Sequence, residues 1–302
     1  MSETAPKVDI LLSAFNGEAY LRAQLDSLLG QNWPNLAVEI RDDGSADGTA
    51  ALLREYAADP RVTVTEGENL GFIRSFFTLL KNSAPAEYYA FCDQDDVWLP
   101  DKLRRCVEAL SAVDAQTPAM CFTGYELCDG ELHILSRAAQ PWNLSFANAL
   151  VDCAPLGCAA VFNRAARDQI VAAVPEHSCG HDWWLYMVCA ALGRVIPLPE
   201  PGLLYRRHGE NASFGGRGFL RFQLWRFRKF FLGGYFGEIT GQLREFESLY
   251  GPALTAEQRA LLSLFTQKTP GNQWKKIVYP HRFRQTGVDE VLLRLCFLLG
   301  RL

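Results

Sequence analysis

Short apolar segments alternate with amphipathic segments along the N-terminal part of the chain. Five apolar segments are rich in β-branched or aromatic residues and are bounded by turn residues, which predicts strands over 8–15, 37–41, 61–67, 87–92 and 119–125. Apolar positions recur with a period near 3.6 in Glu18–Leu29, which predicts a helix. Further helices are expected over Asp47–Ala58, which stops before Pro60, and over Asp101–Ala112, which follows Pro100. Strand and helix in regular succession predict an α/β fold with a mainly parallel sheet.

Polar loops follow the first four predicted strands, and three of these loops contain glycine. Their sequences are SAFNGE (13–18), RDDGSADGT (41–49), GENLGFIRS (67–75) and CDQDD (92–96). Turn chemistry explains any one of them, and Ser45 or Asp47 would suit a helix cap. The carboxyl ends of parallel strands meet at one edge of a sheet, where ligands bind. Four such loops at one edge therefore favour a shared polar ligand.

The stretch FCDQDDVW places three carboxylates within four residues, directly behind an apolar strand. Carboxylates this close raise one another's pKa unless a cation lies among them. In an extended segment Asp93 and Asp95 share a face and Asp96 points the other way. Carboxylate oxygens are suitable ligands for Mg²⁺ or Mn²⁺. An alternative remains open, in which Asp95 or Asp96 caps the following helix or pairs with Lys102 or Arg104.

Composition and missing motifs exclude several classes of protein. The chain has 302 residues, of which 49% are hydrophobic and 21% charged, so it is a folded globular protein rather than a disordered one. Neither G-x-x-x-x-G-K-[ST] nor G-x-G-x-x-G follows the first strand, so neither a P-loop nor a dinucleotide fold is supported. The nine cysteines include no C-x-x-C pair and are expected to be reduced, buried thiols. No secretion signal and no run long enough to cross a bilayer are evident, which predicts a cytoplasmic protein.

Charge divides the chain into two predicted modules. From Ser213 onward, 14 Lys and Arg against 6 Asp and Glu give +8, which leaves −12 for residues 1–212. The turn-rich GENASFGGRG marks the boundary between the two. We therefore expect an acidic module over 1–212, which the resemblance described below makes the catalytic domain, and a basic, aromatic-rich helical region over 213–302.

The predicted C-terminal region interleaves cations with aromatic residues in GFLRFQLWRFRKFFLGGYF. A helix that is basic on one side and aromatic on the other suits an anionic membrane surface, which predicts peripheral association with the inner face of the cell membrane. Cations at 275, 276, 282 and 284 and the tail VLLRLCFLLGRL extend the pattern. Ordinary helix packing, with the arginines solvated or bound to an acceptor phosphate, is the alternative. RNA binding is the weaker alternative, and we expect no nucleic-acid partner.

With these motifs in order, residues 7–212 resemble inverting glycosyltransferases of family 2, which have the GT-A fold. FCDQDDVWLPDKL is similar to the corresponding segment of the bacterial rhamnosyltransferase branch. The resemblance implies a Rossmann-like, mixed, mainly parallel sheet with a C-terminal helical appendage. It also implies metal-dependent transfer of a sugar, L-rhamnose from dTDP-L-rhamnose, onto a bacterial and lipid-linked polysaccharide acceptor.

The resemblance assigns nucleotide-binding roles residue by residue. Asp42 would accept a hydrogen bond from a pyrimidine base, and Asp43 would support the loop. Arg74 matches the family's N-x-G-x-x-R-like segment, although a solvated helix residue is equally expected there. The residues that would lie beside the nucleotide are Ser13, Ala14, Phe15, Asn69, Gly71 and Arg74.

The resemblance also supplies the metal and diphosphate ligands. Asp93 would approach the ribose or the metal, and Asp95 would bind the metal directly. LLYRRHGENAS is similar to the Y-R-x-H-x-x-N stretch of this branch. In it, His208 would be a third metal ligand through a neutral imidazole, and Arg206 or Arg207 would contact the diphosphate.

The base that deprotonates the acceptor hydroxyl would be Asp182, in the segment SCGHDWWLYMVCAAL. A helix N-terminus favours the ionised carboxylate, but aspartate is also a common first-turn residue. Trp183 and Trp184 would form a sugar-stacking wall or pack in the core. A Q-x-x-R-W motif is missing, which favours transfer of one or a few sugars.

Three other functions remain open at this point. A family 2 transferase could use another nucleotide sugar, such as a UDP-hexose. A nucleotidyltransferase would need a glycine-rich, arginine-containing loop after the first strand, and this loop is missing. A catalytically silent subunit that binds a sugar nucleotide or assists assembly is the third.

Overall fold

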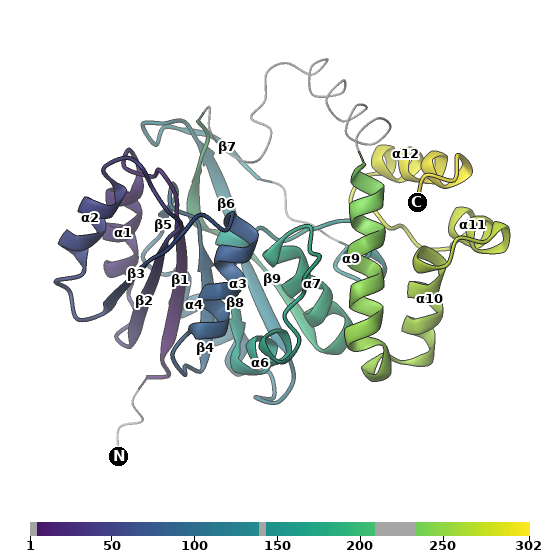
Figure 1. Ribbon diagram of the computed structural model, residues 1–302, viewed down its shortest axis with the longest axis horizontal. Helices are drawn as coiled ribbons and strands as arrows, with labels where there is room; N and C mark the ends of the chain where they lie inside the picture. Colours follow the sequence, from purple (N-terminus) through teal and green to yellow (C-terminus); the bar gives the residue numbers. More distant parts are fainter. Residues whose placement is uncertain (1–4, 139–142, 209–233) are drawn as a thin grey trace. The chain divides into compact units, whose positions relative to one another are not determined.

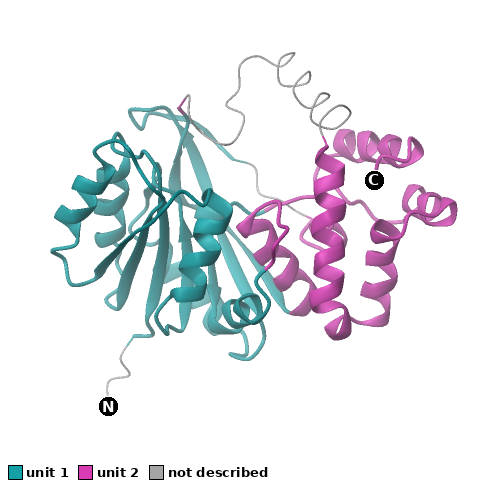
Figure 2. Ribbon diagram, in the orientation of Figure 1, with its two compact units in different colours: residues 1–140, 155–174, 193–207 teal, residues 141–154, 175–192, 208–302 magenta. Residues whose placement is uncertain are grey.

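The computed structural model describes residues 5–138, 143–208 and 234–302. The chain forms two compact units, each built from separate segments (Figure 2). Unit 1 comprises residues 1–140, 155–174 and 193–207, and unit 2 comprises 141–154, 175–192 and 208–302. The boundary predicted near Ser213, and the basic aromatic helix predicted beyond it, fall almost entirely within 209–233, outside the described residues.

Unit 1 is built on a mixed sheet (Figure 1), with the strand order β3-β2-β1-β4-β8-β6-β9-β5 and β7 paired to β6. The strands are β1 (Val8–Ala14), β2 (Leu36–Asp42), β3 (Val62–Glu66), β4 (Tyr88–Cys92), β5 (Val97–Trp98), β6 (Ala119–Cys128), β7 (Ile134–Arg137), β8 (Ala160–Asn163) and β9 (Arg194–Arg206). β1 to β4 are mutually parallel, and β8 joins β4 and β6 by antiparallel pairing. The five predicted strands and the predicted α/β class are confirmed.

The helices of unit 1 cover this sheet. They are α1 (Leu21–Leu29), α2 (Thr49–Tyr56), α3 (Phe72–Asn82), α4 (Lys102–Ser111) and α6 (Arg164–Ala172), with a 3₁₀ turn η1 (Gly157–Ala159). α3 packs on β1 and β2, and α4 packs on β6 and β8. α1 begins at Leu21 rather than at the predicted Glu18, because Tyr20 and Leu21 donate their backbone N–H groups to the Gly17 carbonyl in a preceding turn.

Unit 2 is helical. Its elements are α5 (Phe146–Ala149), α7 (His181–Leu192), α9 (Tyr235–Tyr250), η3 (Gly251–Ala253), α10 (Ala256–Thr266), α11 (Pro270–Ile277) and α12 (Gly287–Leu298). α7 is apolar on nearly every side and is buried accordingly, with the Trp184 ring centroid 5.5 Å from that of Phe246. Threonines cap α10, α11 and α12, where Thr255, Thr269 and Thr286 each accept a backbone N–H bond. Within the described ranges, no helix combines the length and the hydropathy needed to cross a bilayer.

Candidate functional site

The loops at the carboxyl ends of β1, β2, β3 and β4 meet at one edge of the sheet, as their parallel order predicts. The loop after β1 and the loop after β4 are joined by two reciprocal hydrogen bonds. The Phe15 N–H donates to Gln94 Oε1 at 2.8 Å, and Gln94 Nε2 donates to the Phe15 carbonyl at 2.9 Å. A side chain at Gly17 would collide with Gln94. The glycine therefore permits this close approach, and Gln94 is a connecting residue that sequence reasoning missed.

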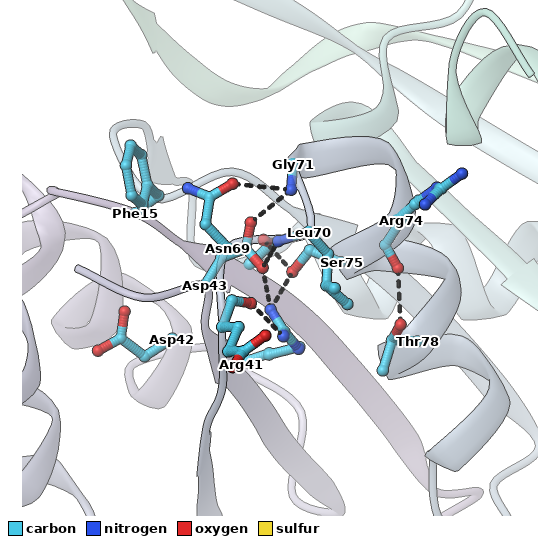
Figure 3. A network of polar contacts seen from close by, with 12 residues as sticks. Phe15, Arg41, Asp42, Asp43, Asn69, Leu70, Gly71, Arg74, Ser75 and Thr78 are labelled. Atoms are coloured by element: carbon cyan, nitrogen blue, oxygen red, sulfur yellow. Dashed lines mark hydrogen bonds and ion pairs between the residues drawn. The ribbon is translucent and has the colours of Figure 1, made fainter.

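A buried ion pair joins the loops after β2 and β3 (Figure 3). Arg41 pairs with Asp43, and the two Asp43 oxygens accept the backbone N–H groups of Leu70 and Gly71 at 2.9 Å each. Arg41 also donates to the Glu68 carbonyl at 2.8 Å. Only 6% of Arg41 and 2% of Asp43 is exposed. Asp43 therefore holds the loop in place, as the sequence suggested, whereas nothing in the sequence singled out Arg41 as its partner.

The candidate nucleotide-binding residues surround this ion pair. Asp42 is buried, points away from the Asp43 network in Figure 3, and accepts bonds from the Ser45 N–H at 3.0 Å and the Ser45 hydroxyl at 2.6 Å. The Ser13 hydroxyl donates to the Ser75 hydroxyl at 2.6 Å. Ala14 is fully buried, and its carbonyl accepts the Asp43 N–H at 2.8 Å.

Three further candidates are exposed at the same edge. Phe15 is 44% exposed, and Asn69 is exposed and accepts the Gly71 N–H at 3.0 Å. Gly71 has φ 78°, a backbone conformation that favours glycine, immediately before α3. Arg74 is exposed and its side chain extends away from the Asp43 network (Figure 3). This edge thus offers an aromatic ring, an amide and a cation to a bound molecule.

The acidic loop, which we define as Asp93–Asp96, does not continue the strand. It forms bends between β4 and β5, so the alternation expected of an extended segment does not apply. Asp93 and Asp95 are half-buried, and Asp96 is fully buried. Asp93, Asp96 and Cys158 form a cluster, in which one carboxylate oxygen of each aspartate and the cysteine Sγ lie within 4.8 Å of one another. Burial, followed by the charges of Asp93 and Asp95, raises the pKa of Asp96 well above its ordinary value.

Arg206 stabilises the acidic loop through hydrogen bonds to Asp95 and Asp96. Its backbone N–H donates to Asp96 Oδ1 at 3.1 Å, and its Nε donates to the Asp95 carbonyl at 2.8 Å. The guanidinium also donates to the Gly130 carbonyl and lies 4.7 Å from the centre of the Tyr20 ring. Only 4% of the residue is exposed. Arg206 therefore positions the loop, a role that the sequence did not reveal.

The helix that follows the acidic loop does not pair with Asp96. Lys102 is fully buried, donates from Nζ to the Cys158 carbonyl and lies over the Trp98 ring. Burial lowers the pKa of Lys102 to about 8. Arg104 pairs instead with Asp101 and Glu108 on its own helix. The ion pair between Asp96 and one of these cations, which the sequence left open, is therefore wrong, whereas the alternative for Asp95 stays a prediction.

The carboxylates of the acidic loop fit a hard divalent cation. Asp96 Oδ2 is buried and has no hydrogen-bond partner among the described residues. Burial raises the pKa of the Cys158 thiol well above its ordinary value, and nearby carboxylates raise it further, so this sulfur stays protonated. Mg²⁺ and Mn²⁺ bind carboxylate oxygens in preference to a neutral thiol. Asp93 and Asp96 are accordingly the residues of this cluster suited to such an ion, whereas Asp95, half-buried in the same loop, is not among the three residues whose ligand atoms lie within 4.8 Å.

Arg207 and His208 follow β9. The Arg207 N–H donates to the Cys128 carbonyl at 2.8 Å, and its side chain is half-buried. His208 is half-buried and is the first residue of the last segment of unit 2. Their roles toward a diphosphate or a metal remain predictions.

Asp182 occupies the first turn of α7 in unit 2, where the helix dipole favours a carboxylate. It is half-buried, and Oδ1 accepts the Trp183 N–H at 2.8 Å. Its neighbour His181 is buried, which lowers the histidine pKa to about 4 and keeps the ring neutral. Trp183 and Trp184 are only 5% and 0% exposed, so both pack in the core of unit 2, and the predicted sugar-stacking wall is wrong.

Sequence comparison identifies the family. The model of the family described as Glycosyl transferase family 2 matches residues 9–174, which is more than half of the chain. The chain belongs to glycosyl transferase family 2. This match includes the loops after β1 to β4 and confirms the family predicted from the sequence.

Curated relatives of this family 2 chain are distant. An uncharacterised glycosyltransferase of Rickettsia prowazekii is 29% identical over 131 residues, which cover 43% of this chain and 40% of that protein. The chain thus matches less than half the length of this relative. The dTDP-rhamnosyl transferase RfbG of Shigella flexneri is 23% identical over 224 residues, which cover 67% of this chain and 75% of that protein.

Solved structures share the fold. TarS of S. aureus in complex with UDP-GlcNAc has a TM-score of 0.59 at 15% identity, covering 97% of this chain and 92% of that one. The mannosyltransferase PcManGT of Pyrobaculum calidifontis, in complex with GDP-Man and Mn²⁺, has a TM-score of 0.55 at 16% identity, covering 99% and 86%. These likenesses confirm the predicted GT-A fold with its helical C-terminal region.

Proposed function

We propose that this family 2 protein is a metal-dependent, inverting glycosyltransferase that moves L-rhamnose from dTDP-L-rhamnose onto a lipid-linked bacterial polysaccharide at the inner face of the cell membrane. The observation that carries the proposal is the acidic loop, which follows β4 and is hydrogen-bonded through Gln94 to the loop after β1. Rhamnose is supported by the similarity to RfbG, which is named a dTDP-rhamnosyl transferase.

The nucleotide would lie across the ends of β1, β2 and β3. Asp42 retains lone pairs on its carboxylate after accepting from Ser45, so it suits the N–H of a pyrimidine base. The exposed Phe15 ring suits the face of that base. Asn69 and the exposed Arg74 would contact the ribose or the diphosphate.

A divalent cation would be held by Asp93 and Asp95, with His208 as a further ligand. Bound there, it would supply positive charge to the departing nucleotide diphosphate. Asp96 and Arg206 would keep the loop in position, and Arg207 would contact the diphosphate. PcManGT, which was solved with Mn²⁺, gives fold-level support for a cation.

Asp182 would act as the base. Inversion requires a group that takes the proton of the acceptor hydroxyl on the face opposite the departing diphosphate. A half-buried carboxylate in the first turn of a helix, where the helix dipole favours negative charge, suits this role. The carboxylate takes the proton, the acceptor oxygen forms the new bond to the anomeric carbon, and the diphosphate leaves with the bonding electrons.

The experiment is a thermal-shift panel of dTDP-L-rhamnose, UDP-glucose, UDP-GlcNAc and GDP-mannose, each with and without Mn²⁺. A ligand at about a hundred times its Kd adds roughly 2.7 kcal/mol, which shifts Tm by a few degrees. We expect dTDP-L-rhamnose with Mn²⁺ to stabilise the wild type and the control Asp114→Asn, whose residue is exposed before β6, but not Asp95→Asn.

The other outcomes separate the alternatives. Stabilisation by a UDP-sugar alone would keep the transferase and discard rhamnose. If no nucleotide sugar shifts the wild type, the proposed sugar donor site is wrong. Asp182→Asn should retain the shift and lose transfer, and unchanged turnover would remove Asp182 as the base while leaving a binding site intact.

A further inference from the structure

Helix α12 of unit 2 is apolar on two opposite sides. Its inner side buries Leu293, Cys296 and Phe297, and the Phe297 ring centroid lies 5.9 Å from that of Phe265. Its outer side exposes residues that recur at intervals of three and four and therefore share one face. These residues, each 45% to 70% exposed, are Val288, Val291, Leu295 and Leu298, followed by Leu299 at 64%. Burial of the inner side contributes to the stability of unit 2, whereas the exposed outer side does not pack in its core.

Helix α11, which packs against α12, carries a second exposed apolar pair. Trp274 is 62% exposed and Val278 is 51% exposed, and the four-residue spacing puts them on one side of α11. We call these two residues and the five exposed residues of α12 and its end the outer apolar surface. Large side chains gathered in this way are uncommon on a monomer without an interaction partner.

Cations outnumber carboxylates among the exposed charged side chains near the outer apolar surface, although the exposed Glu257 of α10 interacts with Tyr279, next to Val278. The exposed charged side chains of residues 267–302 are Lys268, Lys275, Arg282 and Arg301. The two acidic side chains of this stretch are withdrawn. Glu290 is buried and accepts from Arg294 Nε at 2.7 Å, and Asp289 is half-buried beside Thr286, whose hydroxyl donates to it. The surface therefore combines exposed apolar groups with an excess of nearby cations.

We propose that the outer apolar surface docks on an anionic lipid bilayer. Apolar side chains on one face of a helix enter the boundary between headgroups and acyl chains, and lysine and arginine at the rim are attracted to anionic lipids. Trp274 suits this boundary, because tryptophan is enriched there. At 12 residues, α12 is about 18 Å long, so it lies along the interface and does not cross the bilayer.

A second copy of the chain is the competing occupant, and the charges oppose it. Two outer apolar surfaces facing each other would bring the cations Lys275, Arg282 and Arg301 of one copy toward the same cations of the other. Like charges at a contact are costly, whereas a bilayer containing anionic lipid supplies the opposite sign. The proposal rests on the membrane location within the proposed function and deepens it by naming the surface that binds. Because the test needs no nucleotide sugar, its failure is distinguishable from a failure of sugar transfer.

The test is sedimentation of the full-length protein with vesicles of phosphatidylcholine alone or of equimolar phosphatidylcholine and phosphatidylglycerol. The apolar variant is Val291→Ser, Leu295→Ser and Leu298→Ser combined, and the charge variant is Lys275→Glu and Arg282→Glu combined. We expect the wild type to sediment with the anionic vesicles and each variant to partition at least about tenfold more weakly.

Matched controls change equally exposed residues of unit 1. Ile134→Ser with Leu135→Ser, on β7, removes exposed apolar groups, and Arg54→Glu with Lys81→Glu reverses exposed cations. Both controls should bind like the wild type. Equal binding by the apolar variant would overturn the proposal, as would a wild-type dimer in lipid-free sedimentation that the apolar variant converts to monomer. Because no sugar donor is present, failure here leaves the proposed transfer untouched.

Discussion

Asp43 and Asp96 are both buried at the same edge of the sheet, and each is held by an arginine, yet their surroundings differ. Asp43 receives the guanidinium of Arg41 and two backbone N–H groups. Asp96 accepts the backbone N–H of Arg206 and lies beside the Cys158 thiol, and burial, followed by the charges of Asp93 and Asp95, raises its pKa. One aspartate is thus part of a satisfied support, whereas the other sits in a concentration of acidic groups that suits a cation. Burial alone does not distinguish them, but the partners do.

The largest effect should come from removing the charge of Asp43. Asp43→Asn leaves the buried guanidinium of Arg41 without its counter-charge, which should lower the free energy of unfolding by about 3–5 kcal/mol. Asp96→Asn replaces a buried carboxyl, whose pKa is raised well above its ordinary value, by an amide of the same shape that still accepts from Arg206, so the loss should stay within about 1 kcal/mol. Urea denaturation of both variants measures the difference, and equal losses would remove the distinction.

Asp95→Asn should affect activity rather than folding. If the acidic loop binds the cation that neutralises the diphosphate, losing one ligand charge should lower Mn²⁺-dependent turnover of the sugar donor at least about a hundredfold, or about 2.7 kcal/mol. Release of nucleotide diphosphate, followed by chromatography, measures this rate. Turnover within a factor of two of the Asp114→Asn control would show that Asp95 is no metal ligand.

Arg206 connects the two halves of the comparison, because it supports the acidic loop as Arg41 supports the loop after β2. Arg206→Gln removes its hydrogen bonds to the Asp95 and Gly130 carbonyls. We expect roughly tenfold weaker Mn²⁺-dependent nucleotide binding, with partial recovery in Arg206→Lys, which keeps the charge but lacks the planar fork. A guanidinium that contacts the diphosphate directly would instead weaken nucleotide binding without Mn²⁺ as well, which calorimetry distinguishes.

Asp9 extends the comparison to a third buried aspartate, near the start of β1. Burial and the Glu39 carboxylate raise its pKa to about 8. The folded state therefore keeps a proton that the unfolded state has lost above about pH 4, so stability is present at low pH and falls as the pH rises toward 8. Asp9→Asn should flatten this fall by at most about 1.4 kcal/mol per pH unit. Parallel stability curves for the two proteins between pH 5 and 8 would contradict it.

Most of unit 1 was predictable because local patterns determine it. The five apolar strand segments and the polar loops behind four of them give the parallel order and the edge where the candidate site lies. The short strands β5 and β8 and the long strand β9 escaped prediction because their pairing partners are distant in sequence. β5 is two residues long and pairs with β9, more than a hundred residues away.

Several candidate ligand residues could be predicted from the sequence, but the contacts that hold their loops in place could not. Asp42, Asp93 and Asp95 follow strands and could be found from position and charge. Arg41 was not found, because an arginine beside an acidic residue is common and only the fold decides whether the two meet. Arg206 was found as a candidate diphosphate ligand, but its contacts with the acidic loop depend on pairing between distant segments. The prediction that Asp93 and Asp95 share one face and Asp96 the other did not apply, because side chains alternate only where the backbone is extended and Asp93–Asp96 forms bends.

The most direct test of the account is calorimetric titration of dTDP into the wild type, Asp95→Asn and Asp114→Asn, each with Mn²⁺ and with excess chelator. The account predicts Mn²⁺-dependent binding by the wild type and Asp114→Asn, and at least about a hundredfold weaker binding by Asp95→Asn in Mn²⁺. Equal affinities of all three proteins in Mn²⁺ and in chelator would contradict a metal site in the acidic loop.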